Sequence, residues 1–238
     1  MVNTNRYKPL LLFEDNHLVA VSKPAGWLVQ RDEVGSPSVE EWLKELIKGR
    51  DHKPGNVYLA ALHRLDRPVA GVVLFAKTSK AASRVAAEFR ARRVFKSYFA
   101  LVQGSPPRRS GVLNHHLVRD GRRRKTLCVT PDTPGSQEAV LNYRLVEMAE
   151  WFESPLEAPP GTLLEIIPHT GRSHQIRAQL AALGCPLLGD TKYGAKAALP
   201  ARNIALFARR LEFSHPITAL KVVIETAPGR GWPWVVID

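Results

Sequence analysis

A loop that places one carboxylate between two guanidinium groups is the first part of the sequence where chemistry is expected. The segment reads His63-Arg64-Leu65-Asp66-Arg67. A cation within about 4–6 Å lowers the pKa of an aspartate by about 1–3 units, so we expect the Asp66 carboxyl group to be ionised. An ionised aspartate can act as a nucleophile or a base, or it can form a structural ion pair. These five residues alone leave the choice open.

A second polar cluster follows a predicted strand and opens a predicted helix. It reads Thr170-Gly171-Arg172-Ser173-His174-Gln175-Ile176-Arg177. Ile176, Leu180 and Leu183 would share the buried face of this helix, and Arg177 comes one position after the first of them, at the edge of that face. An arginine there either extends to water or reaches a buried anion. The residues by themselves favour the extension to water.

Apolar periodicity predicts the elements that must position these two clusters. Ser38 begins a capping-box pattern ahead of one helix, and Thr78 or Ser79 is expected to cap another. A third helix is expected over about residues 173–183. Strands are expected at residues 10–13, 18–21, 57–62, 72–76, 94–102, 112–118, 139–146, 163–167, 206–213 and 220–225.

Strands outnumber helices in this pattern, and the regular alternation of strand and helix that marks a doubly wound sheet is missing. The sequence therefore predicts an α+β fold with a large mixed, mainly antiparallel sheet flanked by helices. Pro68 keeps the Asp66 segment in a loop, because proline cannot continue a helix or a central strand. No internal repeat or linker is visible, so we expect one domain over residues 1–238.

Positive charge is concentrated in one part of the chain. The 238 residues include 34 Lys and Arg against 22 Asp and Glu, a formal net charge of +12. Between Arg84 and Lys125 there are twelve Lys and Arg against Glu88 and Asp120, so this basic block holds +10 and the rest of the chain +2. Such a block requires either an anionic partner or extensive solvation. No basic amphipathic helix suited to a membrane surface is present, so nucleic acid is the expected partner.

Several classes of protein are excluded by composition. Two cysteines, Cys128 and Cys185, are too few for a disulfide framework or a cysteine-rich zinc site, which favours the reducing cytoplasm. The His115-His116 pair lacks the helical spacing of a zinc motif, and we expect no metal and no cofactor. No apolar run approaches the roughly 18 residues of a membrane span, and no signal-peptide core is present, so no membrane partner is expected.

Five ordered motifs then make the chain similar to a known family. They are Lys23-Pro24-x-Gly26, His63-Arg64-Leu65-Asp66 with Gly71 and Ala76-Lys77 after it, Lys96-x-Tyr98-x-Ala100-x-Val102-x-Gly104, Gly171-Arg172-Ser173-His174-Gln175-Ile176-Arg177 and Phe213-x-His215-Pro216. Together they cover most of the chain and resemble the RluA-type pseudouridine synthases. Residues 23–29 and Asp66-Arg67-Pro68 are most similar to the TruC-like branch, which modifies tRNA.

The resemblance implies a cofactor-independent reaction on a uridine already in RNA, in which the N1–C1′ bond is cleaved and the base is rejoined through C5. It implies that Asp66 is the essential carboxylate, which either adds covalently to the nucleotide or assists formation of a glycal-type intermediate. Tyr98 would stack on the target base, with a part in proton transfer left open. Arg177 would pair with Asp66, and Arg64 would fill the gap that the flipped nucleotide leaves in the RNA stack.

The expected partner is tRNA or ribosomal RNA, bound by a monomer without a nucleotide cofactor. Residues before Leu10 are too few for the S4-like RNA-binding domain that some relatives carry, so the catalytic domain is expected to recognise RNA by itself. RNA contacts are expected from the following residues: Arg64, Arg67, Lys96, Arg122, Arg123, Arg124, Arg172, His174 and Gln175.

The chain departs from the family pattern at a few positions. Val69-Ala70 stands where the family usually has Thr-Ser, and Gln30 and Gln179 stand where histidine is common. The missing hydroxyls favour a rival hypothesis, a catalytically silent RNA-binding factor with the same fold. A third hypothesis is a phosphodiesterase that would use Asp66 and His63.

Overall fold

Side chains predicted to cap helices do so in the structure, a computed structural model that describes residues 8–52, 54–147, 161–229 and 232–233. Helix α1 (Val39–Arg50) begins after Ser38, whose Oγ accepts the Glu41 N–H, and α2 (Ser79–Arg90) begins after Thr78, whose Oγ1 accepts the Ala81 N–H. Satisfying an otherwise unpaired N–H group in the first turn stabilises a helix by about 1 kcal/mol.

The chain forms two compact units, which are described separately. Unit 1 consists of Met1–Lys96, Ala208–Pro228 and Asp238, and unit 2 of Ser97–Phe207 and Gly229–Ile237. The single domain predicted for the chain therefore stays a prediction. Among the described residues, no helix combines the length and the apolar character needed to cross a membrane.

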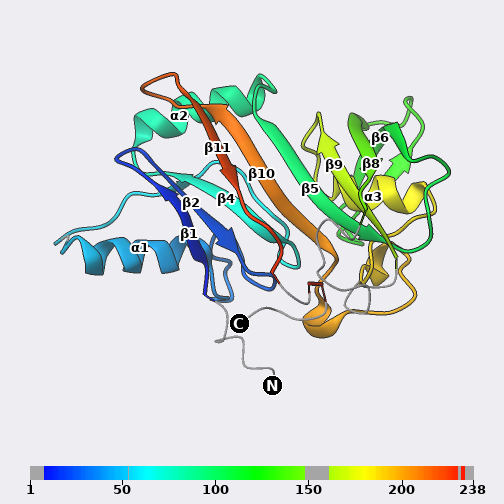
Figure 1. The fold of residues 1–238 in the computed structure, drawn as a ribbon, viewed down its shortest axis with the longest axis horizontal. Helices are drawn as coiled ribbons and strands as arrows, with labels where there is room; N and C mark the ends of the chain where they lie inside the picture. Colours follow the sequence, from blue (N-terminus) through cyan, green and yellow to red (C-terminus); the bar gives the residue numbers. More distant parts are fainter. Residues whose placement is uncertain (1–7, 53, 148–160, 230–231, 234–238) are drawn as a thin grey trace. The chain divides into compact units, whose positions relative to one another are not determined.

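Unit 1 is built on strands in the order β1-β2-β4-β10, in which β3 also pairs with β4 and β11 with β10 (Figure 1). The pairs β1–β2, β2–β4, β3–β4 and β10–β11 are antiparallel. Its helices are α1 and α2. The strands are β1 (Leu10–Glu14), β2 (Leu18–Lys23), β3 (Ala60–Ala61), β4 (Ala70–Ala76), β10 (Leu206–Ser214, from Ala208 in this unit) and β11 (Lys221–Glu225).

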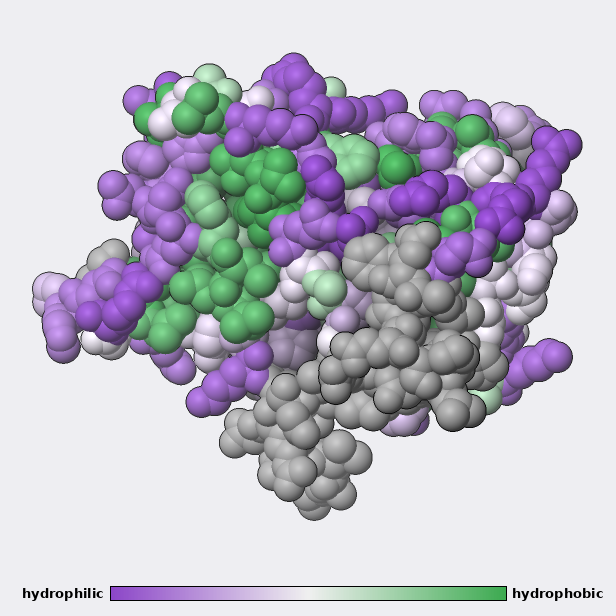
Figure 2. All heavy atoms as spheres, viewed as in Figure 1, coloured by the Kyte–Doolittle hydropathy of each residue, from purple (hydrophilic) through white to green (hydrophobic). Residues whose placement is uncertain are grey.

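One apolar core in unit 1 joins β2, β4, β10 and α2. Leu18, Leu74 and Leu211 of the strands pack with Val85 of the helix, and all four side chains are buried. Figure 2 shows further apolar side chains at the surface over β1, β2 and β11. The exposed ones among them include Leu10 and Val223.

Gly71 is required where β4 lies against β10. Its φ is +115°, and a Cβ at this position would lie 2.2 Å from the carbonyl oxygen of Ala208. Only glycine avoids both the steric overlap and the unfavourable backbone conformation. The motif glycine that follows the Asp66 loop is therefore explained by close packing of two strands.

Unit 2 has antiparallel strands in the order β5-β9-β8-β6-β7, with one longer helix, α3 (Gln175–Ala182) (Figure 1). The strands are β5 (Phe95–Val102, from Ser97 in this unit), β6 (Ser110–Asp120), β7 (Lys125–Val129), β8 (Gln137–Leu145) and β9 (Thr162–Pro168), and two short 3-10 turns are η3 (Thr191–Tyr193) and η4 (Pro200–Arg202). The predicted α+β class with a large, mainly antiparallel sheet is confirmed.

Two predicted elements had wrong boundaries, and one strand was missed. The strand expected at 57–62 shrinks to Ala60–Ala61, and β7 was not predicted at all. Helix α3 starts at Gln175 rather than at Ser173, because His174 adopts a left-handed conformation with φ +52°. Such backbone geometry at a residue other than glycine ends helical periodicity, and apolar spacing gives no sign of it.

Candidate functional site

The Asp66 loop lies between β3 and β4 of unit 1 and is fastened to the turn that follows β2. Lys23, the last residue of β2, has a fully buried side chain. Its Nζ donates to the main-chain carbonyls of Pro24 (2.9 Å), Trp27 (2.8 Å) and Arg67 (3.3 Å). One ammonium group thus ties the two loops together, since two acceptors belong to the turn and the third to the residue after Asp66.

Main-chain bonds reinforce the same junction. The Gly26 N–H donates to the Arg67 carbonyl at 2.8 Å, and Arg67 Nε donates back to the Gly26 carbonyl at 3.0 Å. Asp66 itself is partly exposed, and its carbonyl accepts the Val69 N–H at 3.0 Å. The loop therefore has fixed backbone geometry on both sides of the carboxylate.

The buried Lys23 is close enough to Asp66 for their charges to interact. Burial lowers the pKa of Lys23 to about 7, while the negative charge of Asp66 raises it and the positive charge of Arg67 lowers it. From the sequence, Lys23 is part of a motif but has no predicted role. The available signal was a lysine at the end of an almost entirely apolar strand, a position where a charged side chain needs buried partners.

The apolar pair that departs from the family pattern fits the same loop. Val69 is 2 % exposed and belongs to the core, and its N–H makes the turn bond to Asp66 described above. Because the backbone supplies this bond, the loop does not need a hydroxyl at position 69 to close. The missing hydroxyls therefore lend little weight to the hypothesis of a silent factor.

His63 has a structural role in unit 1. Its Nε2 accepts the Leu74 N–H at 3.1 Å, and its ring stacks on Phe89 with centroids 5.4 Å apart. Burial, helped by the positive charge of Lys96, lowers the pKa of His63 to about 3. A ring that stays neutral near pH 7 with Nε2 already occupied cannot readily exchange protons there, which argues against the phosphodiesterase hypothesis.

Arg177 of α3 is buried in unit 2 and reaches a carboxylate. Its Nε donates to Asp190 Oδ2 at 2.7 Å and its Nη2 to Asp190 Oδ1 at 2.9 Å, while the guanidinium lies 4.9 Å from the centroid of the Tyr193 ring. The extension to water that the residues favoured is wrong, and the alternative of a buried anion holds. Asp190 was missed because it lies 13 residues away, outside any local pattern. The predicted pairing of Arg177 with Asp66 stays a prediction, since the two residues belong to different units.

Polar side chains before α3 hold the helix in place. Gln175 is buried, and its Oε1 accepts both the Thr170 hydroxyl at 2.8 Å and the Arg172 N–H at 3.0 Å. Its Nε2 donates to the Val140 carbonyl at 3.1 Å. Gln175 therefore has a structural role, and its predicted contact with RNA stays a prediction. Arg172 lies beside it, partly exposed, with Nε donating to the Glu138 carbonyl.

Tyr98, predicted to stack on the target base, and Arg64, predicted to fill the gap in the RNA stack, are both accessible to solvent. Tyr98 lies on β5 opposite Ile166 of β9 and is partly exposed, between Ser97 and Phe99, which are buried. Arg64 is exposed, and Lys96 is partly buried, which lowers its pKa. Their predicted roles toward RNA stay predictions.

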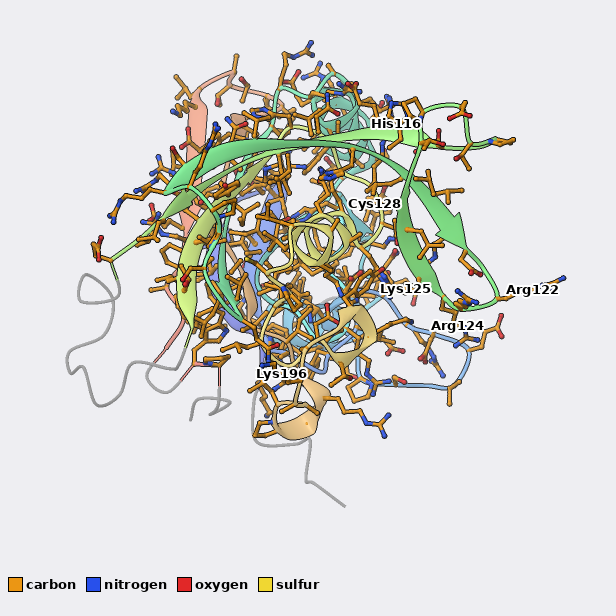
Figure 3. All side chains as sticks on the ribbon, turned by 90° about the vertical axis from the view of Figure 1, so that its right-hand side faces the viewer. His116, Arg122, Arg124, Lys125, Cys128 and Lys196 are labelled. Carbon is orange, nitrogen blue, oxygen red and sulfur yellow. The ribbon has the colours of Figure 1, made fainter. Side chains whose placement is uncertain are left out.

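The basic block is divided between the units, with five of its twelve cations in unit 1 and seven in unit 2. In unit 2, Arg122, Arg123 and Arg124 form the exposed turn of the β6–β7 hairpin. Figure 3 shows Arg122 pointing away from the tip of this hairpin, whereas Lys125 lies on the side nearer to α3. Arg123 is held by Asp120, which accepts its N–H at 3.0 Å and lies 3.7 Å from its Nε.

Metal-binding chemistry has no evident place in the described part of the chain. Among these residues, no three His, Cys, Asp or Glu side chains come together in a way that could hold a metal ion. Cys128 and Cys185 are both free thiols, and burial raises the pKa of each, which disfavours the thiolate form that binds metals.

Comparison with known proteins decides the family. The model of a family described as RNA pseudouridylate synthase matches residues 17–182, a range that includes the Asp66 loop, Tyr98 and Arg177. The chain belongs to this family. The predicted resemblance is thereby confirmed, together with the predicted class of enzyme, a pseudouridine synthase.

Relatives within the family match nearly the whole chain. A protein of Pasteurella multocida named tRNA pseudouridine synthase C is 35% identical, over 93% of this chain and 92% of its own length. A protein of Rickettsia prowazekii named ribosomal large subunit pseudouridine synthase C is 31% identical, over 90% of this chain and 66% of its own length. Among solved structures, human RNA pseudouridylate synthase domain containing 4 superposes with a TM-score of 0.71 at 26% identity, covering 92% of this chain and 88% of that one.

Proposed function

We propose that this pseudouridine synthase isomerises a uridine of structured RNA, that its substrate is tRNA, and that Asp66 is the carboxylate on which the reaction depends. The observation that carries the assignment of Asp66 is the construction of its loop, which the buried Lys23 ammonium joins to the turn after β2. A catalytic group must be held in one geometry, and this junction supplies that restraint. A relative named for tRNA that matches over nearly the full length of both chains supports the choice of substrate.

The reaction balances within the RNA. The N1–C1′ bond breaks, the uracil rotates, a C5–C1′ bond forms, the proton leaves C5 and N1 takes up a proton. No electron acceptor or second substrate is required. Asp66 either adds to the nucleotide, forming and later breaking one covalent bond, or assists removal of a sugar proton to give a glycal-type intermediate. Both routes need an ionised carboxylate and an extruded base.

Extrusion of the uridine costs a few kcal/mol, which the protein must recover. Stacking of the base on Tyr98 would return about 1–3 kcal/mol. Arg64 would occupy the gap in the RNA stack, and Arg177 would pair with Asp66. The remaining RNA contacts would come from Arg67, Lys96, Arg122, Arg123, Arg124, Arg172 and His174. We expect the protein to act as a cytoplasmic monomer, without cofactor or metal.

The test is tritium release from unmodified tRNA transcripts that carry uridine labelled at C5. Asp66→Asn preserves shape and removes the charge, and we expect turnover to fall by at least about a thousandfold while the folded state persists. Asp132→Asn, at an exposed aspartate in the loop after β7, is the matched control and should keep wild-type turnover. Wild-type turnover in Asp66→Asn would remove Asp66 from the mechanism. Tight RNA binding by the wild-type protein with no release from any transcript would instead identify a silent RNA-binding factor.

A further inference from the structure

A second group of cations lies next to the turn of the β6–β7 hairpin, around the ring of Tyr193. Lys125 Nζ is 4.9 Å from the centroid of this ring, and Lys192 is the residue directly before the tyrosine in η3. Arg119, at the end of β6, donates from Nη1 to Ser173 Oγ at 3.1 Å and lies 3.4 Å from His174 Nδ1. Residues that are far apart in the sequence are thus gathered beside the start of α3.

Tyr193 fixes the geometry of this cluster. Its hydroxyl oxygen accepts the Thr126 N–H at 2.7 Å and bonds to His174 Nδ1 at 2.8 Å. Thr126 Oγ1 in turn donates to the Ser173 carbonyl at 2.8 Å. The hairpin, η3 and the residues before α3 are therefore held together by buried bonds, and the cations project from a fixed support.

The charges in this cluster are mostly not neutralised. Asp190, the acid directly before η3, accepts hydrogen bonds from Arg177 with both of its carboxylate oxygens. Among the described residues, no carboxylate lies within 4.0 Å of the side-chain nitrogens of Arg119, Arg124, Lys125 or Lys192. The acids nearby pair with other cations, Asp120 with Arg123 and Asp190 with Arg177. Burial together with the charges of Arg177, Arg119 and Arg124 lowers the pKa of Lys192, and the opposing effect of the Asp190 charge does not offset them.

Other cations of the basic block, by contrast, are paired with carboxylates of the protein. Arg109 pairs with Glu147, and Arg93 forms several hydrogen bonds to Glu88. These side chains have found carboxylates within the protein, whereas the cations around Tyr193 have not. A fixed group of cations without nearby carboxylates is suited to a ligand that carries several negative charges, such as the phosphate backbone of RNA.

We propose that Arg119, Arg124, Lys125 and Lys192 form a phosphate clamp for the backbone of the substrate RNA, and that this clamp, more than Arg122 and Arg123 in the turn of the hairpin, anchors the RNA to unit 2. The inference rests on the proposed function for the identity of the ligand. Lys192 lies outside the basic block from which RNA contacts were expected, and only the folding of η3 against the hairpin brings it close to Lys125.

The clamp can be tested by the salt dependence of binding to a fluorescein-labelled, in vitro transcribed tRNA. Each phosphate contact contributes about 0.7–0.9 to the slope of log K against log salt concentration, so loss of two contacts should make the slope shallower by about 1.4–1.8. The double variant Arg119→Gln/Lys192→Gln removes two charges and keeps hydrogen-bonding side chains. We expect that slope change and a higher KM with nearly unchanged kcat.

The matched control is Arg109→Gln/Lys196→Gln, which removes the same number of charges from the same unit. Arg109 is paired with Glu147, and Lys196 lies apart from the hairpin in Figure 3. This control should keep the wild-type slope. An equal change in both double variants would show that only overall charge matters and would overturn the clamp, as would a wild-type slope in Arg119→Gln/Lys192→Gln.

The clamp and the proposed function fail in different ways. If the wild-type protein releases tritium from tRNA but the clamp variant keeps the wild-type slope, the clamp is wrong and the function stands. If no transcript is turned over and the clamp variant alone shows the shallower slope, the proposed function is wrong and the clamp remains an RNA-binding site. Thermal unfolding of each variant checks that a changed slope does not come from a misfolded hairpin.

Discussion

Two buried cations, Lys23 in unit 1 and Arg177 in unit 2, satisfy their charge in different ways. Arg177 has a carboxylate of its own, bound through two N–H groups, whereas the ammonium of Lys23 donates to three main-chain carbonyls. The Arg177–Asp190 pair is close to neutral as a whole. Lys23, when protonated, places its positive charge close to Asp66. The charge of Arg177 is thus balanced within a rigid ion pair, whereas the charge of Lys23 acts on the nearby Asp66 carboxylate.

The guanidinium geometry explains why the two sites use different residues. Arginine is always charged and presents a planar fork that matches both oxygens of a carboxylate. Lysine offers three donors around one point, which suits three carbonyls from three places in the chain, and its pKa can move when it is buried. If this contrast is correct, removing the acid from one site and the cation from the other should have distinct consequences.

The largest effect is expected from Asp190→Asn. The substitution keeps the shape of the side chain but removes the charge that receives two N–H groups of Arg177, and breaking a buried ion pair on one side costs about 3–5 kcal/mol. Urea unfolding measures the loss. Asp120→Asn, which affects a longer and more exposed contact with Arg123, is the control and should change stability far less. An equal loss of unfolding free energy in the two variants would contradict the claim that the buried pair contributes more to stability than the exposed contact.

A smaller loss is expected from Lys23→Met. The substitution leaves the carbonyls of Pro24, Trp27 and Arg67 without this donor, but it also removes a charge that is costly to bury, so a net loss of about 1–3 kcal/mol is expected. The local sign is faster hydrogen exchange at the Gly26 N–H, which bonds to the Arg67 carbonyl. Lys44→Met, at a lysine paired with Glu40 on α1, is the control. Unchanged exchange at Gly26 in Lys23→Met would show that the loops hold without the ammonium.

The contrast between the two cations also marks the limit of prediction from the sequence. The capping side chains Ser38 and Thr78 and most strands could be predicted, because these depend on neighbours a few residues away. The partner of Arg177 and the support around Tyr193 could not, because they join residues separated by 13 and 67 positions. Asp66 and its loop were found through motifs, whereas the reason for the Lys23 motif became visible only once its three acceptors were placed in space.

The last expected effect is a difference in pH dependence between the two cations. Arg177 stays protonated at every pH at which the protein is folded. Lys23 has a pKa of about 7 in the folded protein against an ordinary value of 10.5, so between these pH values the unfolded chain binds the proton and the folded protein releases it. Stability contributed by this group therefore rises with pH from about 7 to 10.5, by up to about 1.4 kcal/mol per pH unit. The measurement is the free energy of unfolding of wild type minus that of Lys23→Met, from pH 6 to about 9.5. A difference that stays flat over this range would mean that the three carbonyls keep Lys23 protonated in the folded protein, and the charge beside Asp66 would then be permanent, like that of Arg177.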